Sequence, residues 1–408
     1  MNDPRPRLAF VSPLFLFPND AGGKIRTTNI LRGLKGGQFR LRLLSPASGE
    51  QQSHWATEIN SVCDDFVPWQ PTPLKPRWQR GLGLLGDIPV NIASDKTRPA
   101  MNAVQALADG DEADLMVFDF VHASVLRPAQ LRCKSVCFTH NVEAEIFARH
   151  AQHAPDMVRR WMWTSQHRKM VRFERDALRR YDGVVAVSER DARHFRDAYG
   201  VTHAHAIPTG VDLDHFTWQA PPNTGAPSVV FTGSMDAPAN HDGVQWFLNG
   251  VWPRVVAAVP AARFVVVGRN PPAALLAMGR QMPNVEFTGF VDDVRPYIRS
   301  AQVSVIPLLV GGGTRIKAFE AMAMGSAVVS TAVGIEGLDV THGQHFIESD
   351  DAAGFAAAVV QLLNDAAARL GYSQRARERV ESRFGHQVAA RAFEQICLRA
   401  LGPRAPAR

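Results

Sequence analysis

Cysteine is scarce in this sequence. Only four cysteines occur among 408 residues, at positions 63, 133, 137 and 397. Their irregular spacing argues against a disulfide framework and against a zinc site. A reducing compartment therefore fits best.

Targeting and membrane-spanning segments are also missing. Met1–Arg7 runs directly into Leu8–Ser12 and then Pro13, which leaves no apolar core of signal-peptide length. Nowhere does the chain approach the roughly 18 consecutive apolar residues that a membrane span needs. We expect a cytoplasmic protein and leave open peripheral contact with the inner face of the cell membrane.

Nucleic-acid signatures are missing too: there is no zinc-finger spacing, no aromatic RNA-binding motif and no basic region running into heptads. The chain does have an excess of positive charge, because 45 Lys and Arg against 39 Asp and Glu give a net charge of +6. Such a surface attracts nucleotides, phospholipid headgroups or acidic glycans, and net charge alone does not choose among them. We expect no nucleic-acid partner.

Short β-type runs alternate with helical stretches along the chain. The runs are Leu8–Ser12, Arg40–Leu44, Leu115–Phe118, Ser135–Thr139, Val184–Val187, Ser228–Thr232, Arg263–Val267, Val285–Phe287, Val303–Pro307 and Ala327–Ser330. Continuous apolar strands between helices indicate parallel sheets that are covered on both faces. Because the chain is long enough for two domains, the predicted fold is α/β, with two Rossmann-like, doubly wound domains.

The stretch Phe216–Pro227 is rich in proline and can sustain neither a helix nor a central strand, which makes it the expected linker. The predicted domains are residues 1–216 and 217–385. Residues 386–408 are expected to form a C-terminal helix and a frayed tail, with the option of packing back on the first domain. Ligands of parallel sheets bind at the carboxyl ends of the strands, so the expected site is a cleft between the two domains.

A glycine-rich turn follows the expected strand Val303–Pro307. It reads Gly311-Gly312-Gly313-Thr314-Arg315-Ile316-Lys317 and opens a helix that carries Glu320. Free backbone N–H groups and the helix dipole at such a turn suit a diphosphate, and Arg315 and Lys317 add positive charge. The carboxylate of Glu320 can accept hydrogen bonds from a pair of ribose hydroxyls. By residue type alone, an ordinary strand-to-helix loop with solvated charges is an equally good interpretation.

This run resembles glycosyltransferase family 4, a group of retaining enzymes with the GT-B fold that use nucleotide-sugars. Those enzymes carry a Glu-x7-Glu element at this place. Glu320 matches its second glutamate, which contacts the ribose, whereas Gly312 stands where the first would be. The run is similar to the Gly-Gly-Gly-Thr-Arg-Ile-Lys variant of bacterial exopolysaccharide and lipid-linked glycan transferases. In that variant, backbone groups near Gly312 and Gly313 would replace the missing carboxylate.

The resemblance extends over nearly the whole chain and implies further donor contacts in the second domain. Many relatives have Arg and Lys where this chain has Ser234 and Ala239, so Arg315 and Lys317 are expected to supply most of the charge for the phosphates. Phe290 is a candidate contact of the base, with simple packing as the alternative. The implied donor-binding residues of this domain are Ser234, Arg269, Phe290, Gly312, Gly313, Thr314, Arg315, Lys317 and Glu320.

In the first domain, Gly22 and Gly23 resemble a glycine loop that lies against the donor phosphate and the acceptor; the alternative is a plain turn. His140 follows the strand Ser135–Thr139 and matches a family histidine that reaches the donor sugar. The alternative is a histidine that satisfies a loop carbonyl. Glu143 and Glu145 are candidate acceptor bases, and Glu145 is better explained as part of a helix first turn. The catalytic candidates are therefore His140 and Glu143.

The stretch from Met157 to Arg180 is basic and partly aromatic. Its charges are Arg159, Arg160, Arg168, Lys169, Arg172, Arg175, Arg179 and Arg180 against Glu174 and Asp176, with Trp161 and Trp163 nearby. One interpretation is a surface that lies on an anionic membrane, where a lipid-linked acceptor would be found. The slightly favoured alternative is a solvated helix face, opposite Met170, Phe173, Ala177 and Tyr181 that point to the core.

The predicted function is that of a retaining hexosyltransferase. It would move a sugar from a UDP- or GDP-sugar to a glycan or lipid-linked acceptor in polysaccharide biosynthesis, with no cofactor and no obligatory metal ion, because fixed charges stabilise the leaving diphosphate. One alternative is a nucleotide-sugar epimerase of GT-B fold, which needs additional acid and base carboxylates. Another is a nucleotide-sugar-binding scaffold in a polysaccharide assembly complex. A Rossmann oxidoreductase is disfavoured because no Gly-x-Gly-x-x-Gly follows the first strand.

Overall fold

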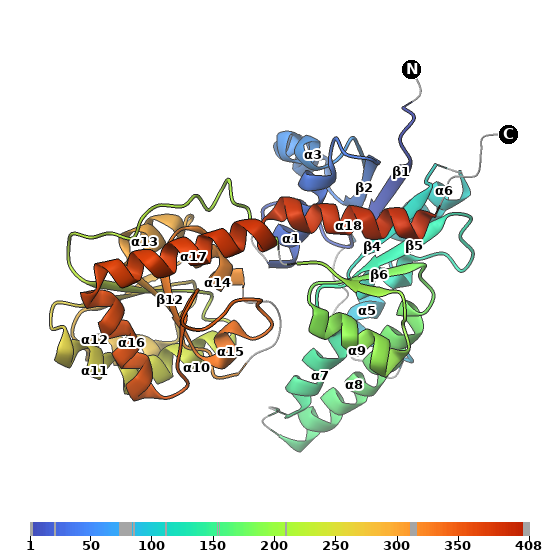
Figure 1. Ribbon diagram of the computed structural model, residues 1–408. Coiled ribbons are helices and arrows are strands. Elements are labelled where there is room, and N and C mark those ends of the chain that lie inside the picture. The colour runs from blue at the N-terminus through green and yellow to red at the C-terminus, as the bar shows by residue number, and fades with distance from the viewer. Residues whose placement is uncertain are drawn as a thin grey trace. The chain divides into compact units, whose positions relative to one another are not determined.

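The computed structural model describes residues 3–19, 22–72, 84, 86–110, 112–152, 154, 156–208, 210–310 and 316–402. The chain divides into two compact units (Figure 1): Met1–Gly210 together with His386–Arg408, and Val211–Gly385. The expected linker, Phe216–Pro227, contains no helix or strand and belongs to the second unit. Its backbone is tied to that unit, because the N–H of Gln219 donates to the carbonyl of Met324 over 3.2 Å.

The first unit is built on a seven-stranded sheet with the order β3-β2-β1-β4-β5-β6-β7, in which every pairing is parallel. Its strands are β1 (Arg7–Val11), β2 (Arg40–Pro46), β3 (Asp65–Trp69), β4 (Leu115–Asp119), β5 (Lys134–Phe138), β6 (Gly183–Ala186) and β7 (Ala204–Ala206). Successive residues of β1 enter different cores: Leu8 and Phe10 belong to one, Ala9 and Val11 to the other. The sheet is therefore buried on both faces, and this explains why its strands are continuously apolar.

Helices cover both faces of this sheet. Side chains of α1 (Gly22–Leu34), α3 (Ala56–Val62) and α18 (His386–Leu401) pack on the face of Leu8 and Phe10. The opposite face receives side chains from α5 (Val90–Asp95), α6 (Arg98–Asp109), the 3₁₀ helix η2 (Val121–Leu126), α7 (Glu143–Gln152), α8 (Met157–Leu178) and α9 (Glu189–Tyr199). The short helix α2 (Gly49–His54) follows β2. The unit is thus a doubly wound α/β domain, as predicted.

The C-terminal helix α18 completes the first unit and runs beside α1 (Figure 1). The ring of Phe393 lies 5.1 Å from that of Phe138 and 6.4 Å from that of Phe10, measured between centroids. A Cβ added at Gly33 would lie 2.4 Å from the Cβ of Ala390, so glycine is needed where α1 and α18 approach each other. One face of the first sheet therefore depends on the last helix described.

The second unit contains a six-stranded parallel sheet with the order β10-β9-β8-β11-β12-β13. Its strands are β8 (Ser228–Thr232), β9 (Arg263–Val267), β10 (Val285–Gly289), β11 (Val303–Ile306), β12 (Ala327–Ser330) and β13 (Ile347–Glu348). Its helices are α10 (Pro238–Trp246), the π-helical turn η3 (Phe247–Val251), α11 (Trp252–Ala258), α12 (Ala273–Arg280), α13 (Arg295–Ser300), α14 (Ile316–Ala323), α15 (Ala332–Ile335), α16 (Ala352–Asn364) and α17 (Ala366–Phe384). The predicted pair of doubly wound α/β domains is confirmed.

The basic stretch Met157–Arg180 forms α8 and the residues that follow it. Met170, Ala177 and Tyr181 are buried in the first core, and Phe173 packs against that core. The predicted core-facing side of this helix is therefore confirmed. Within the described residues, no helix has the length and apolar character needed to cross a bilayer.

We expect Phe393→Ala to destabilise the first unit by about 3–5 kcal/mol, because it leaves a cavity between α18 and the sheet. Chemical denaturation followed by circular dichroism measures the change. The matched control is Gln395→Ala, two residues away on the exposed side of α18, which should change stability by less than about 0.5 kcal/mol. Equal, small effects of both substitutions would contradict a structural role for this contact.

Candidate functional site

In the second unit, the candidate residues follow the carboxyl ends of neighbouring strands. Ser234 comes shortly after β8, Arg269 after β9 and Phe290 after β10. These strands are adjacent and parallel, so their carboxyl ends meet at one edge of the sheet. Four predicted donor contacts, Gly312, Gly313, Thr314 and Arg315, lie outside the described residues. The description resumes at Ile316, where α14 begins.

Lys317 extends from the first turn of α14 to the turn that follows β8. Its ammonium group donates a hydrogen bond of 2.7 Å to Oδ1 of Asn240 and lies 4.3 Å from the ring centroid of Phe231. A Cβ added at Gly233 would lie only 2.6 Å from this Nζ atom. The side-chain amide of Asn240 in turn donates to the carbonyl of Ser234 over 2.7 Å. The structure thus brings the charge of Lys317 to the carboxyl end of β8.

Ser234 and Arg269 lie in a hydrogen-bonded cluster at the same sheet edge. Arg269 Nε donates to Asp236 Oδ2 over 3.0 Å and to Ser234 Oγ over 3.3 Å, and Asn270 also donates to Asp236. The hydrogen bond from Asn270, followed by those from Ser234 and Arg269, holds the pKa of Asp236 below its usual range. Both partners of the Arg269–Asp236 ion pair are about half exposed. Sequence reasoning missed Asp236 and Asn240.

Glu320 lies one turn beyond Lys317 on α14 and is partly buried. Burial raises the pKa of its carboxyl group to about 7, although the charge of Lys317 opposes the shift. A carboxyl group with this pKa is close to half ionised at neutral pH, so a partner that donates hydrogen bonds would favour its charged form. Phe290 is 70% exposed, and simple core packing does not explain its position.

In the first unit, His140 is buried next to the carboxylate of Asp119. The ring Nε2 lies 2.8 Å from Asp119 Oδ1, and the hydroxyls of Thr27 and Ser12 lie 2.9 and 3.1 Å from Asp119 Oδ2. Asp119 is the last residue of β4 and is fully buried. Because a carboxylate only accepts hydrogen bonds, this arrangement assigns the proton of a neutral His140 to Nε2 and leaves Nδ1 as an acceptor.

The ring of His140 is fixed in position by aromatic stacking. The Phe120 ring lies 3.9 Å from it, with an interplanar angle of 16°. Phe120 has φ 63° and ψ 149°, a region that is almost exclusive to glycine and costs of order 1–3 kcal/mol. Burial lowers the pKa of His140, with Asp119 opposing, which favours the neutral ring. Among the described residues, Nδ1 has no hydrogen-bond partner.

Gly23, at the start of α1, lies against this histidine. A Cβ added there would lie 2.7 Å from Cζ of Phe120 and 3.9 Å from Nδ1 of His140. The structure therefore brings together Gly23 and His140, two residues that the sequence singled out separately, and Gly22 is the exposed neighbour of Gly23. The residues around them that sequence reasoning missed are Ser12, Thr27, Asp119 and Phe120. Asp119 carried a usable signal, since it directly follows the apolar run Leu115–Phe118.

Glu143 belongs to a buried polar network at the start of α7. Its Oε2 lies 3.4 Å from Nε2 of His122, and its backbone N–H donates to Glu174 Oε1 over 2.8 Å. Burial lowers the pKa of His122, but the hydrogen bond and charge of Glu143, together with the charges of Asp95 and Glu174, raise it overall. Glu143 also lines a mostly apolar pocket of about 340 Å³ with Phe147 and Trp163. Its carboxylate is thus engaged within the protein at the edge of this pocket.

Two further carboxylates near α7 have structural partners. Glu145 binds Arg190 through both of its oxygens at 2.7 Å, consistent with an ordinary ion pair. Glu174 is fully buried and accepts hydrogen bonds from the N–H of Glu143 and from the hydroxyl of Tyr199, the latter over 2.9 Å. Burial raises the pKa of Glu174 to about 8, although these hydrogen bonds oppose the shift.

Family models match both units. The model described as Glycosyltransferase Family 4 matches residues 22–215, and the model described as Glycosyl transferases group 1 matches residues 226–365. The chain is 35% identical over 226 residues to a phosphatidyl-myo-inositol mannosyltransferase of Mycolicibacterium smegmatis. That match covers 52% of this chain and 57% of the relative, so it spans little more than half of that protein.

Solved structures resemble the whole fold at low sequence identity. Sucrose-phosphate synthase from Thermosynechococcus elongatus has a TM-score of 0.68 and 17% identity, with 96% of this chain and 98% of that chain covered. The Anabaena protein Alr3699/HepE in complex with UDP and glucose has a TM-score of 0.66 and 14% identity, with 95% and 98% covered. The predicted GT-B fold is confirmed.

The high pKa of Glu174 predicts a pH-dependent stability. The folded protein holds this proton more tightly than the unfolded chain, whose value is 4.5. The stabilising contribution is therefore complete below that value and is lost as the pH rises towards 8, by at most about 1.4 kcal/mol per pH unit. Relative to Glu174→Gln, which cannot ionise, the wild type should lose stability from about pH 5 to about pH 8.

Urea denaturation of both proteins across this pH range measures the difference. Glu50→Gln, at an exposed glutamate of the same unit, is the matched control and should follow the wild type at every pH. A constant difference between the wild type and Glu174→Gln would show that Glu174 is ionised in the folded protein.

Proposed function

Because this chain belongs to the glycosyltransferases with the GT-B fold, we propose that it transfers a sugar from a nucleoside-diphosphate sugar to an acceptor. The donor nucleotide would bind at the carboxyl edge of the second sheet. The observation that carries this proposal is the position of Lys317 Nζ, 2.7 Å from Asn240 and against the turn at Gly233. A fixed ammonium group at the end of a parallel strand is suited to a diphosphate.

The other donor contacts that we propose surround this ammonium group. Gly312, Gly313, Thr314 and Arg315 precede α14, where backbone N–H groups and a second cation would bind the phosphates. Glu320 would accept hydrogen bonds from the ribose, and a pKa near 7 implies that ribose binding draws it into its charged form. Ser234 and Arg269 would complete the phosphate side, and the exposed ring of Phe290 would contact the base.

We further propose that the first unit supplies the sugar-side and acceptor-side groups. His140 would accept a hydrogen bond from a sugar hydroxyl through Nδ1, next to the backbone of Gly22 and Gly23. Glu143, on the pocket beside α7, would orient the acceptor. The transfer would retain anomeric configuration by front-face attack and would need no metal ion, because the cations of the second unit stabilise the leaving diphosphate.

The proposed acceptor is a glycan or a lipid-linked glycan in the biosynthesis of an exopolysaccharide or a related polymer. The name of the mannosyltransferase relative contains a phosphatidylinositol, which supports a lipid-linked acceptor, and the UDP complex of HepE supports a nucleotide-sugar donor. A lipid-linked acceptor would require the protein to work at the inner face of the cell membrane as a peripheral protein.

Lys317→Ala should weaken UDP or GDP binding by about 1.5–3 kcal/mol, the range for a hydrogen bond to a charged group. Binding of the corresponding nucleoside should change little, because it carries no phosphate. Isothermal titration calorimetry measures both. Arg280→Ala, which removes an exposed cation of the same unit on α12, is the matched control and should bind like the wild type. Equal loss of nucleoside and diphosphate affinity would contradict a phosphate contact.

His140→Ala should lower turnover of the nucleotide-sugar donor by about 10²-fold or more, while nucleotide affinity stays unchanged because the nucleotide binds the other unit. Donor hydrolysis and transfer by the purified protein measure turnover, retained UDP or GDP binding shows that the second unit is folded, and an unchanged urea-denaturation curve shows the same for the first unit. Unchanged turnover would leave His140 with a structural role only. Epimerisation of the free donor without any acceptor would favour the alternative of a GT-B epimerase.

A further inference from the structure

Helix α8 exposes a stripe of side chains that no part of the proposed sugar transfer uses. At its N-terminal end, Met157, Val158 and Trp161 are 87%, 76% and 74% exposed. In an α-helix, positions three and four residues apart share a face. The stripe therefore continues along the helix through Thr164 and Ser165 to a cluster of basic residues. We call this set of side chains the α8 stripe; its members are Met157, Val158, Trp161, Thr164, Ser165, Arg168, Lys169 and Arg172.

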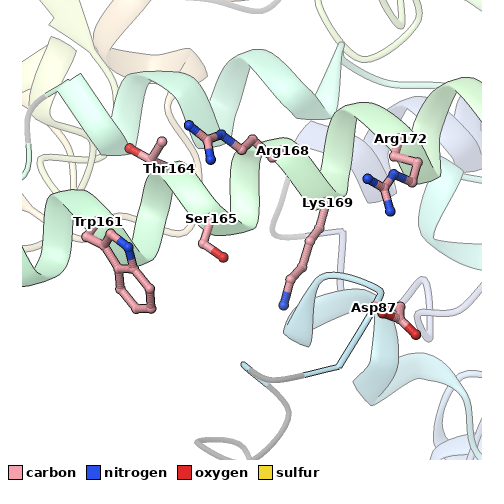
Figure 2. A pocket seen from close by; sticks show the side chains of 7 residues that line it. All are labelled: Asp87, Trp161, Thr164, Ser165, Arg168, Lys169 and Arg172. Carbon is pink, nitrogen blue, oxygen red and sulfur yellow. The ribbon is translucent and has the colours of Figure 1, made fainter.

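The basic end of the α8 stripe forms a pocket of about 330 Å³ (Figure 2). The side chains that line it are Asp87, Trp161, Thr164, Ser165, Arg168, Lys169 and Arg172. Lys169 points towards the segment before α5, where its ammonium group donates to the carbonyl of Leu84 over 2.6 Å. The pocket thus combines three cations and one carboxylate with the edge of an exposed indole ring.

The two arginines of this pocket differ from Arg175 and Arg179 near the C-terminal end of α8. Within the described residues, the guanidinium groups of Arg168 and Arg172 have no hydrogen-bonding or ionic partner, and the same holds for Arg160. By contrast, Arg175 is paired with Asp176 at 2.9 Å, and Arg179 donates to the carbonyl of Tyr199 over 2.7 Å. The uncompensated arginine charge of the helix therefore lies between Arg160 and Arg172, next to the exposed apolar end.

We propose that the α8 stripe docks the protein on an anionic phospholipid bilayer. The lipid phosphate would bind Arg168, Lys169 and Arg172 in the pocket, and Met157, Val158 and Trp161 would enter the boundary between headgroups and acyl chains. Trp161 lines the pocket and also belongs to the apolar end, so one lipid molecule can contact both parts. The inference deepens the proposed membrane location and rests on it.

Two physical arguments favour a bilayer over bulk water or a soluble anion. Basic residues near an anionic membrane surface each strengthen binding, and tryptophan is enriched at membrane interfaces because its ring is apolar and its N–H is polar. A soluble phosphate would need only the cations, and it would leave three large apolar side chains exposed to water without a role. An anionic bilayer can contact the basic end of the stripe through its phosphates and the apolar end through its acyl chains.

The test is flotation of the full-length protein with vesicles and needs no sugar transfer. We expect binding to vesicles of equimolar phosphatidylcholine and phosphatidylglycerol, weaker binding at high salt because salt screens the charges, and little binding to phosphatidylcholine alone. Arg168→Glu/Arg172→Glu should lower the partition coefficient on the anionic vesicles by about tenfold or more. Trp161→Ser should also lower it, at low as well as high salt.

The matched control is Arg98→Glu/Arg132→Glu, which makes the same change in net charge at two exposed arginines of the first unit outside α8. This variant should bind anionic vesicles like the wild type. Equal loss of binding in both double variants would show that only the net charge of the protein matters, and this would overturn the proposal. Thermal stabilisation by inorganic phosphate without any vesicle binding would also overturn it, because the ligand would then be a soluble anion. Vesicle binding without sugar transfer would contradict only the proposed function.

Discussion

The parallel direction of the strands determines where the candidate site residues of each unit lie. All pairings in both sheets are parallel, so the carboxyl ends of the strands in each unit lie at one edge. Asp119 ends β4, His140 follows β5 closely, and the turn at Gly233 follows β8. Residues far apart in the sequence therefore become neighbours, while the apolar interior of each strand is occupied with packing on both sides.

Buried ionisable groups distinguish the two units. In the first unit, carboxylates at strand and helix ends are buried and fully engaged: Asp119 with His140, and Glu174 with Tyr199 and the backbone of α7. Such groups fix ring orientation and proton position, because a buried carboxylate is costly unless it is paired or neutralised. In the second unit, Lys317 and Arg269 are held by Asn240 and by the half-exposed Asp236. The groups of the first arrangement are buried and hydrogen-bonded, whereas the cations of the second lie closer to solvent.

Sequence patterns predicted all interior strands and one edge strand, β10, but missed the other three edge strands. The three strands that were not predicted, β3, β7 and β13, all lie at an edge of a sheet. An edge strand needs fewer apolar residues, and β3 even contains Pro68, which a central strand would not tolerate. In the candidate site, motif positions such as Lys317 and His140 were recognisable from the sequence. Their partners were not, because Asn240 and Asp119 are ordinary polar residues whose proximity depends on how the strands are ordered.

Because α18 lies near the end of the chain, it affects the order in which the two units can fold during synthesis. The ribosome delivers residues 211–385 before the helix that carries Phe393. The second unit can therefore reach its final form while the first still lacks α18, the helix that packs on Phe10 and Phe138. This reverses the usual expectation that the N-terminal domain of a nascent chain folds first. Until α18 emerges, the apolar part of the sheet face that this helix covers stays exposed, and such a surface is a substrate for chaperones.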